Sequence, residues 1–516
     1  MIHCFKLCGL NIVLDVASGS IHTVDNVAYD VVRLYEHDLS DKGQRELIGR
    51  VASLHPTVSE SDILDIIYKI ESLIEQGKLF SADVYEKLAD NAGAAPLKAL
   101  CLNVSQACNM SCKYCFAGCG ERHGDRERQG DGSSVFPAGQ GTGQGDGSSV
   151  SHPIFAEAES TKRQRDCPPE TSHKTDEPSP CLPLMSVDTG KAAIDFLVKN
   201  SGSAKILDID FFGGEPLLNW NVVKELVTYA RESEKTHGKR FRFTLTTNGL
   251  LIDDDVITFT NRYFHNVVLS LDGRPEVHDA MRKLNGGGGT YDEVAPKIKK
   301  LVDARRAKGY YIRGTFTREN MDFVNDVLHL ADLGYKELSL EPVVTKSDGL
   351  SFGFTLDDVD ELCRQYDLLA VEMQRRIATG SDFSFYHYTL DLENGPCVHK
   401  RIAGCGVGTE YMAVTPDGEL FPCHQFIGEP EFLLGDVWSG VQNERLRSEF
   451  AGASIYSRSE CRDCWARFYC SGGCAANAYF DCGSIGGVHK LGCELFKKRI
   501  ECAIMFSISK ITTKGA

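Results

Sequence analysis

The 516-residue sequence has no long apolar run and no excess of positive charge. No stretch approaches the ~20 apolar residues that cross a bilayer, and Asp15, Asp25 and Asp30 interrupt the first apolar runs, where a signal peptide would lie. The formal net charge of −16 argues against a nucleic-acid backbone as the partner. We therefore expect a cytoplasmic protein that binds neither a membrane nor nucleic acid.

Cysteine, by contrast, is abundant, with 20 in the chain. A cytoplasmic compartment keeps thiols reduced, so metal ligation is a better interpretation than disulfide bonding. One cysteine group lies at residues 108–115, and a longer series follows residue 396. We interpret the scattered cysteines, such as Cys4, Cys101 and Cys502, as small buried hydrophobic residues.

The length predicts about three domains with their own cores, and the first is expected at residues 1–85. Apolar runs at 12–16 and 21–24 predict a hairpin, Asp25 is a candidate helix cap, and a stronger helical pattern runs from Ser59 to Gly77. A hairpin followed by helices is typical of a winged-helix-like unit. Because the chain is acidic, we favour recognition of a peptide by strand addition over DNA binding, with a packing appendage as the alternative.

Residues 95–350 alternate between strand and helix patterns, which predicts a parallel α/β sheet, either doubly wound or a barrel. A helical linker is expected at 351–395. A tract at 119–184 interrupts the rhythm with Gly, Ser, Pro and charged residues, and repeats Gln-Gly-Asp-Gly-Ser-Ser-Val at 129–135 and 144–150. It is predicted to be a disordered insertion. The six predicted strands are 98–104, 206–212, 241–247, 266–271, 310–317 and 337–343.

The first strand of this region leads into Cys108-x3-Cys112-x2-Cys115. A zinc site would require a fourth ligand, whereas three thiolates leave one iron of a four-iron cluster open. The loop resembles that of the radical S-adenosylmethionine (SAM) enzymes. This resemblance implies a [4Fe–4S] cluster on these cysteines, a SAM molecule on the open iron, a 5′-deoxyadenosyl radical product, and Tyr114 as a neighbour of the adenine.

Polar motifs end the next three strands. Gly213-Gly214-Glu215-Pro216 follows the second strand, where a glycine pair allows close approach and a carboxylate can take an ammonium group. This resembles the family motif that holds the methionine amino group of SAM, although a tight turn is the alternative for each motif. Arg282, Arg313 and Glu341 are further polar candidates at the same edge, although surface charge is the favoured interpretation of Arg282. The remaining candidates for the SAM ribose and carboxylate are Thr247, Asn248, Ser270 and Asp272.

The cysteines after residue 396 resemble a SPASM domain, expected at 396–516, which implies two auxiliary [4Fe–4S] clusters. Cys482 is a competitor for the role of Cys493, and a zinc ribbon is the alternative to both clusters. The resemblance assigns the outer cluster to Cys461, Cys464, Cys470 and Cys493, and the inner cluster to Cys405, Cys423 and Cys474, with Cys397 as its fourth ligand.

Segments across nearly all of the chain outside 119–184 resemble the maturases of the six-cysteine peptide called SCIFF. The implied fold is a partial (β/α)6 radical SAM barrel between a winged-helix-like peptide-recognition domain and a SPASM domain. The implied activity joins cysteine sulfurs to α-carbons of a short ribosomally made peptide as thioethers. The expected partners are that cysteine-rich precursor peptide and an electron donor such as a ferredoxin or flavodoxin. A sulfatase-type or amine-dehydrogenase-type maturase, or a zinc-ribbon interaction protein, are the alternatives.

Overall fold

The computed structural model describes residues 1–36, 40–89, 96–115, 183–345, 350–390, 392 and 398–514. Nearly all of the insertion predicted at 119–184 lies outside these ranges, and so does Cys397. The predictions of a disordered insertion and of Cys397 as a ligand therefore stay predictions.

The body of the protein is built on one mixed sheet, ordered β12-β11-β10-β8-β7-β6-β4-β13-β14-β15-β16. All six predicted strands are confirmed, and they lie side by side in chain order and parallel. Within the described residues the outer strands β12 and β16 do not pair, so the sheet is open and does not close into a complete barrel. The six strands are β4 (Ala99–Ser105), β6 (Ile206–Gly213), β7 (Arg240–Thr247), β8 (Asn266–Ser270), β10 (Tyr311–Phe316) and β11 (Glu337–Pro342).

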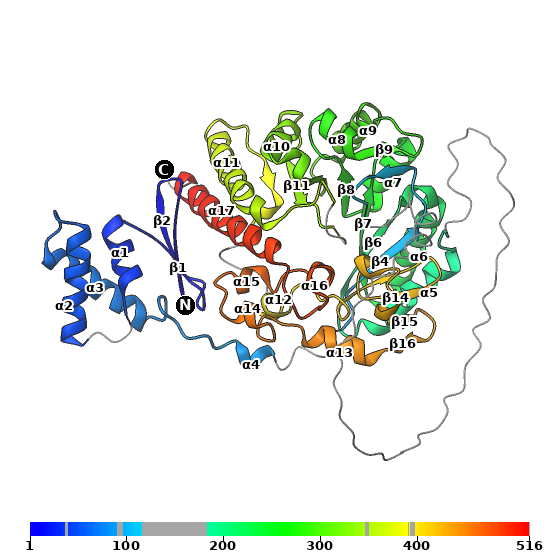
Figure 1. The fold of residues 1–516 in the computed structure, drawn as a ribbon. Helices are drawn as coiled ribbons and strands as arrows, with labels where there is room; N and C mark the ends of the chain where they lie inside the picture. Colours follow the sequence, from blue (N-terminus) through cyan, green and yellow to red (C-terminus); the bar gives the residue numbers. More distant parts are fainter. Residues whose placement is uncertain are drawn as a thin grey trace, which may run out of the picture.

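The two faces of this sheet differ in polarity. On β6, Ile209 and Phe211 are fully buried, and the same alternation continues on β7 with Phe243 and Leu245. Helices cover this apolar face (Figure 1). The opposite, inner face carries half-buried polar side chains. The barrel-region helices are α5 (Val187–Asn200), α6 (Trp220–His237), α7 (Asp254–Tyr263), α8 (Pro275–Met281), α9 (Tyr291–Arg305), α10 (Phe323–Asp332) and α11 (Val359–Ala378).

The cysteine-rich C-terminal region continues the barrel sheet. Strand β13 (Tyr411–Val414) pairs in parallel with β4, and β14 (Glu419–Phe421) returns antiparallel to it. The inner face of the barrel is therefore bordered by the C-terminal region along β4. The remaining elements of this region are α12 (Val398–Ala403), β15 (Gly435–Asp436), β16 (Gly440–Val441), α13 (Glu444–Gly452), α14 (Ser459–Arg462), α15 (Arg467–Cys470), α16 (Ala475–Cys482) and α17 (Lys490–Lys514).

The N-terminal domain has the predicted hairpin, the predicted cap at Asp25 and a helix that begins after Ser59. Asp25 accepts a hydrogen bond from the Ala28 backbone, and Ser59 accepts one from that of Asp62. The sequence did not predict β1, which joins the hairpin to make a three-stranded antiparallel sheet. Its elements are β1 (Ile2–Leu7), β2 (Leu10–Asp15), β3 (Ile21–Val24), α1 (Asn26–Leu34), α2 (Asp41–Leu54) and α3 (Glu60–Glu75), followed by α4 (Glu86–Ala89).

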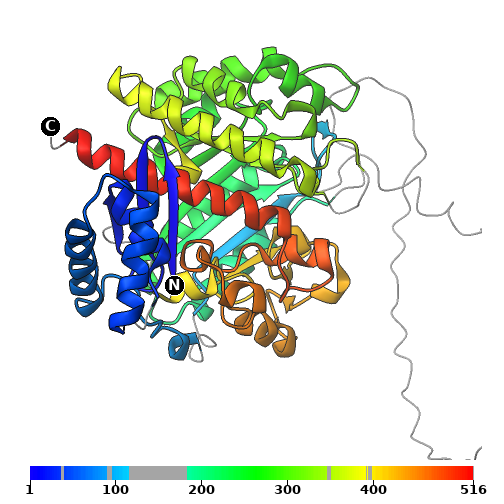
Figure 2. The same cartoon turned by 60° about the vertical axis from the view of Figure 1, so that its left-hand side comes forward.

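This small sheet packs on both faces. Val13 contacts the domain's own helices, whereas Ile12 and Leu14 belong to the core of the main body. Helix α17 lies between β1 and α11 (Figure 2). His3 on β1 contacts Glu501 of α17 at 3.0 Å and stacks on Trp465 with ring centroids 3.6 Å apart. The N-terminal domain is thus fixed to the C-terminal region.

Candidate functional site

The loop with Cys108, Cys112 and Cys115 follows β4 at the carboxyl edge of the parallel strands. Residues Met110–Cys112 form β5, which pairs antiparallel with β9 (Arg282–Leu284), and this pairing sets Cys112 opposite Arg282. Burial and nearby negative charges, among them those of Cys112 and Cys115, raise the pKa of the Cys108 thiol to about 12. The three predicted thiols therefore lie within electrostatic reach of one another.

The Gly213-Gly214 pair brings the end of β6 against the backbone that leads to Cys108. The Gly214 amide donates to the carbonyl of Ser105 at 2.7 Å. A Cβ atom on Gly214 would lie 2.4 Å from the carbonyl oxygen of Ala107, and Gly213 has a φ of +134°. Glycine is required here because the chain approaches the cysteine loop, which is a different reason from the close ligand approach that the sequence suggested.

Glu215 is fully buried and joins the ends of β6 and β7. Its carboxylate accepts hydrogen bonds from the Thr247 hydroxyl at 2.8 Å, the Asn248 amide at 2.8 Å and the Leu217 amide at 3.0 Å. Burial raises the pKa of Glu215 to about 7. The Asn248 side chain donates to Asn109 of the cysteine loop at 2.8 Å. The structure thus brings Glu215, Thr247 and Asn248 together at the base of that loop.

Asp272 connects the end of β8 to the same loop. Its carboxylate accepts hydrogen bonds from the Tyr114 hydroxyl at 2.5 Å, Nε of Arg282 at 3.0 Å and the Thr315 amide at 3.0 Å. The Arg282 side chain is 11% exposed and its guanidinium carbon lies 5.4 Å from the centroid of the Tyr114 ring. The expectation of surface charge for Arg282 is wrong, because the pairing of β9 with β5 turns it inward. No local sequence pattern signals that pairing.

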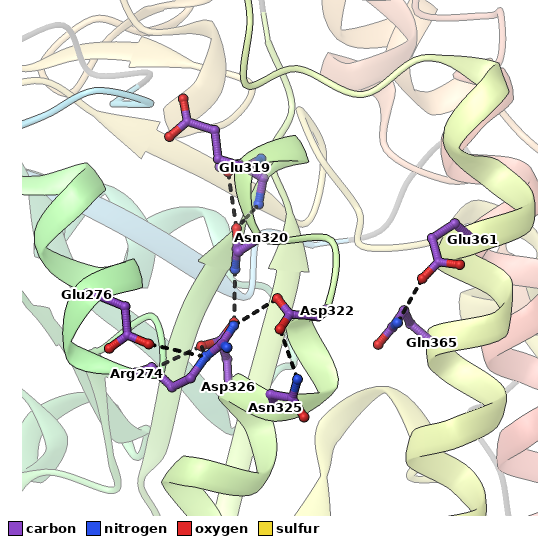
Figure 3. A network of polar contacts seen from close by, with 10 residues as sticks. Arg274, Glu276, Glu319, Asn320, Asp322, Asn325, Asp326, Glu361 and Gln365 are labelled. Carbon is purple, nitrogen blue, oxygen red and sulfur yellow. Dashed lines mark hydrogen bonds and ion pairs between the residues drawn. The ribbon is translucent and has the colours of Figure 1, made fainter.

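Ser270 ends β8 on the inner face, beside Arg313 of β10. Among the described residues its hydroxyl has no hydrogen-bond partner. The turn that follows is held from outside the barrel (Figure 3). A Cβ atom on Gly273 would lie 2.3 Å from Cβ of Asp326, which accepts from Nε of Arg274 at 2.8 Å and from Asn320 at 3.0 Å. These contacts fix the backbone that carries Asp272.

The charges of the described C-terminal cysteines act on one another in two sets, one around Cys423 and one around Cys470. Burial and the charges of Cys474 and Cys405 raise the pKa of Cys423 to about 12. The pKa of Cys470 is likewise raised to about 12, by burial and by the charges of Cys493, Cys461 and Cys464. Cys482 contacts the Ala478 carbonyl within its own helix instead. Their roles as ligands stay predictions, and in the described ranges no three His, Cys, Asp or Glu side chains converge on a single metal ion.

The inner group borders the barrel. Cys423 ends the turn after β14, and the ring of the next residue, His424, lies 4.9 Å from that of Phe212 at the end of β6. The Cys423 charge also acts on Cys101 of β4. Of the inner cysteines, Cys423 therefore lies near the strand end that carries the glycine pair.

A family model described as the radical SAM superfamily matches residues 183–331. The chain is a radical SAM enzyme. The family implies SAM and a [4Fe–4S] cluster. The donor set fits that cluster, because Cys108, Cys112 and Cys115 supply three thiols on one loop at the strand ends. No helix in the described part of the chain is long and apolar enough to span a membrane.

Several known proteins resemble this radical SAM enzyme. The radical SAM cyclopropyl synthase TigE of Paramaledivibacter caminithermalis is 22% identical over 492 residues, which are 93% of this chain and 89% of TigE. A cysteine-type anaerobic sulfatase-maturating enzyme of Clostridium novyi is 23% identical over 320 residues, 58% of this chain and 80% of the relative. The structure of native anSMEcpe with bound AdoMet and the Kp18Cys peptide has a TM-score of 0.57 at 18% identity, and the match covers 80% of this chain and 99% of that one. The radical SAM fold is therefore shared.

Proposed function

We propose that this radical SAM enzyme matures a short, ribosomally made, cysteine-rich peptide by forming thioethers between cysteine sulfurs and α-carbons. The observation that carries the proposal is the position of the inner cysteine group beside the same strand ends as the SAM loop. A peptide bound inside the barrel would lie between the inner cysteine group and the SAM loop. The names of the relatives, a cyclopropyl synthase and a sulfatase-maturating enzyme, support maturation of a peptide or protein.

The proposal assigns three [4Fe–4S] clusters to the three cysteine groups. When bound, the SAM cluster supplies the electron that cleaves SAM, and the auxiliary clusters accept the electron released as the carbon–sulfur bond closes. The SAM cluster would be held by Cys108, Cys112 and Cys115. The outer auxiliary cluster would take Cys461, Cys464, Cys470 and Cys493, and the inner one Cys405, Cys423 and Cys474 with Cys397. A ferredoxin or flavodoxin would reduce the SAM cluster.

The polar groups at the strand ends would hold SAM. The Ser270 hydroxyl is available to a ligand, and the buried Arg282 supplies a cation next to the cysteine loop. Asp272 orients both Arg282 and Tyr114, which supports Tyr114 as the neighbour of the adenine. Glu215 already accepts three hydrogen bonds, so we assign it to holding the Thr247 and Asn248 turn in place.

The N-terminal domain would bind the leader segment of the peptide at β3. Strand β1 lies against α17, whereas β3 is the other outer strand of the sheet. The register of β2 with β3, with the Asp15 amide donating to Ser20 at 2.9 Å, turns the amides of Ile21 and Thr23 away from β2. These amides can pair with an added strand. Deleting residues 1–80 would not test this role cleanly, because Ile12 and Leu14 belong to the core of the main body.

The experiment is anaerobic co-expression with a short cysteine-rich peptide encoded beside the gene. We expect loss of hydrogen from the peptide by mass spectrometry and cysteines that resist alkylation. Replacing Cys108, Cys112 and Cys115 together by Ala should abolish SAM cleavage and remove one cluster's iron. The matched control is Cys482→Ala, which should retain SAM cleavage and the full iron content. An unmodified peptide, or colourless protein that contains zinc, would refute the proposal, and a converted cysteine without a thioether would favour a sulfatase-type maturase.

A further inference from the structure

Arg313 occupies an unusual position for an arginine whose guanidinium has neither a hydrogen bond nor an ion pair in the described part of the chain. It is the third residue of β10, between β8 and β11, and its side chain points to the inner face of the barrel, yet it is exposed. An exposed side chain at the middle of a central strand means that the lumen is open to water. Within the described residues, its guanidinium makes no hydrogen bond and no ion pair.

A cluster of buried polar groups lies near it at the end of β11. Nη1 of Arg499, from α17, lies 3.4 Å from the Glu341 carboxylate, and Nε of Arg499 donates to the Tyr366 hydroxyl at 2.8 Å. His387 follows β12 (Ser384–Phe385), and its Nε2 lies 3.2 Å from Oε1 of Glu341. The elements that meet here are β11, the turn after β12 and α17.

One donor in this cluster is left without a partner among the described residues. Nη2 of Arg499 is buried and makes no hydrogen bond there, and the Arg499 side chain is 9% exposed. Native proteins rarely keep a buried donor without a ligand, ion or water, because the lost hydration is not replaced. This donor therefore indicates a missing acceptor.

The charge balance identifies that acceptor as an anion. The single carboxylate, Glu341, is balanced by Arg499, and the positive charge of Arg313 remains. That charge reaches the cluster, since it contributes with His387 and Arg499 to the lowered pKa of Glu341. A guanidinium offers paired N–H donors that match a carboxylate.

We propose that Arg313, together with Arg499, binds a carboxylate of the peptide substrate inside the barrel. The inference rests on the proposed function in that it takes the substrate to be a peptide. The carboxylate can belong to an acidic side chain or to the C-terminus of the peptide. Arg313 would be a specificity-determining residue that positions the segment to be modified between the SAM site and the inner cysteines.

The test is Arg313→Gln and Arg313→Lys in the full-length, anaerobically loaded enzyme. A fluorescein-labelled synthetic copy of the neighbouring cysteine-rich peptide serves as the probe in binding anisotropy and in turnover. A charged hydrogen bond contributes about 1.5–3 kcal/mol, so we expect Arg313→Gln to raise Kd and KM about 10- to 100-fold, and Arg313→Lys to raise them less. SAM affinity, iron content and melting temperature should not change. The matched control is Arg318→Gln, which removes an exposed arginine just after the same strand.

Two peptide variants identify the source of the carboxylate. Peptides with Asn or Gln in place of acidic residues, or with an amidated C-terminus, are measured against wild-type enzyme and Arg313→Gln. The peptide that lacks the bound carboxylate should bind both enzymes equally weakly.

Equal Kd values for wild type and Arg313→Gln with the unmodified peptide would overturn the inference. Weakened SAM binding would overturn it as well, by moving Arg313 to the SAM site, and a lowered melting temperature would make its role structural. If the peptide binds the wild-type enzyme but is not crosslinked, thioether formation alone is refuted. The difference in peptide Kd between wild type and Arg313→Gln would still decide whether Arg313 binds the carboxylate. Failure of wild type to bind the peptide would refute both.

Discussion

The ion pair between Asp272 and Arg282 provides a sharp test of what holds the cysteine loop. Asp272 is fully buried, and Arg282 is 11% exposed. Asp272→Asn keeps the shape but leaves the guanidinium without its counter-charge. Removing one partner of a buried pair costs about 3–5 kcal/mol, which is a factor of at least ~100 in the folding equilibrium. Because Arg282 begins β9, we expect the loss to appear first as opening of the β5 and β9 pairing.

The chain offers a matched control on the same sheet. Arg242 contacts Asp208 through two hydrogen bonds of 2.7 Å, so its geometry is at least as good as that of Arg282 with Asp272. The side chains of Arg242 and Asp208 are, however, 42% and 34% exposed. Exposed pairs contribute about 0–1 kcal/mol because water screens the charges. Asp208→Asn should therefore cost about 1 kcal/mol or less.

The assay is the denaturant midpoint of each variant, with hydrogen exchange of the amides in 110–112 and 282–284. Asp272→Asn should lower the midpoint clearly and speed exchange in both strands, while Asp208→Asn should change neither appreciably. Similar midpoint losses for the two variants would refute the reasoning that burial decides the strength of the pair. Unchanged exchange in β5 and β9 would refute the role of Arg282 in holding the loop.

Three further predictions follow from single contacts. Gly214→Ala should cost about 1–3 kcal/mol and reduce the iron content, because its Cβ would meet the backbone of Ala107, whereas Gly452→Ala meets no atom within 4 Å and should be nearly neutral. Burial raises the pKa of Glu215 from 4.5 to about 7, so the folded state binds the proton of this carboxyl more tightly than the unfolded state does. The free energy of unfolding should therefore fall as pH rises from 4.5 to about 7. Glu215→Gln should remove this pH dependence in denaturation series, and an unchanged dependence would contradict the prediction. Thr23→Pro should weaken binding of the labelled leader peptide without changing SAM cleavage in the absence of peptide, whereas Thr23→Ala should bind normally.

Much of the scaffold was predictable because its signals are local. The six parallel strands alternate with helices in chain order, and a helix cap such as Asp25 needs only a backbone amide three residues away. The Cys108, Cys112 and Cys115 loop was evident because all three thiols lie within eight consecutive residues. The grouping of the later cysteines followed from a family resemblance and stays a prediction, although Cys423 and Cys470 each feel the charges of described members of their own predicted group.

Other features depend on contacts between distant parts of the chain. Arg282 was expected on the surface, and only the pairing of β9 with β5, some 170 residues earlier, buries it against Asp272. Glu341 meets Arg499 across 158 residues, and neither residue belongs to a motif. The glycine pair also acquires its packing role only when β6 lies beside β4.

The amino-acid sequence by itself therefore determined the elements of the barrel, the cysteine loop and the class of chemistry, because periodicity, caps and ligand spacing act over a few residues. The tertiary structure alone decided which polar groups lie together: the Arg282 pair behind the cysteine loop, and the cluster of Glu341, His387 and Arg499 within electrostatic reach of Arg313. The physical reason is that the energy of a charge depends on its desolvation and its partners. Both are set by strand pairing and by the packing of α17 across the barrel, and residues adjacent in sequence carry no information on either.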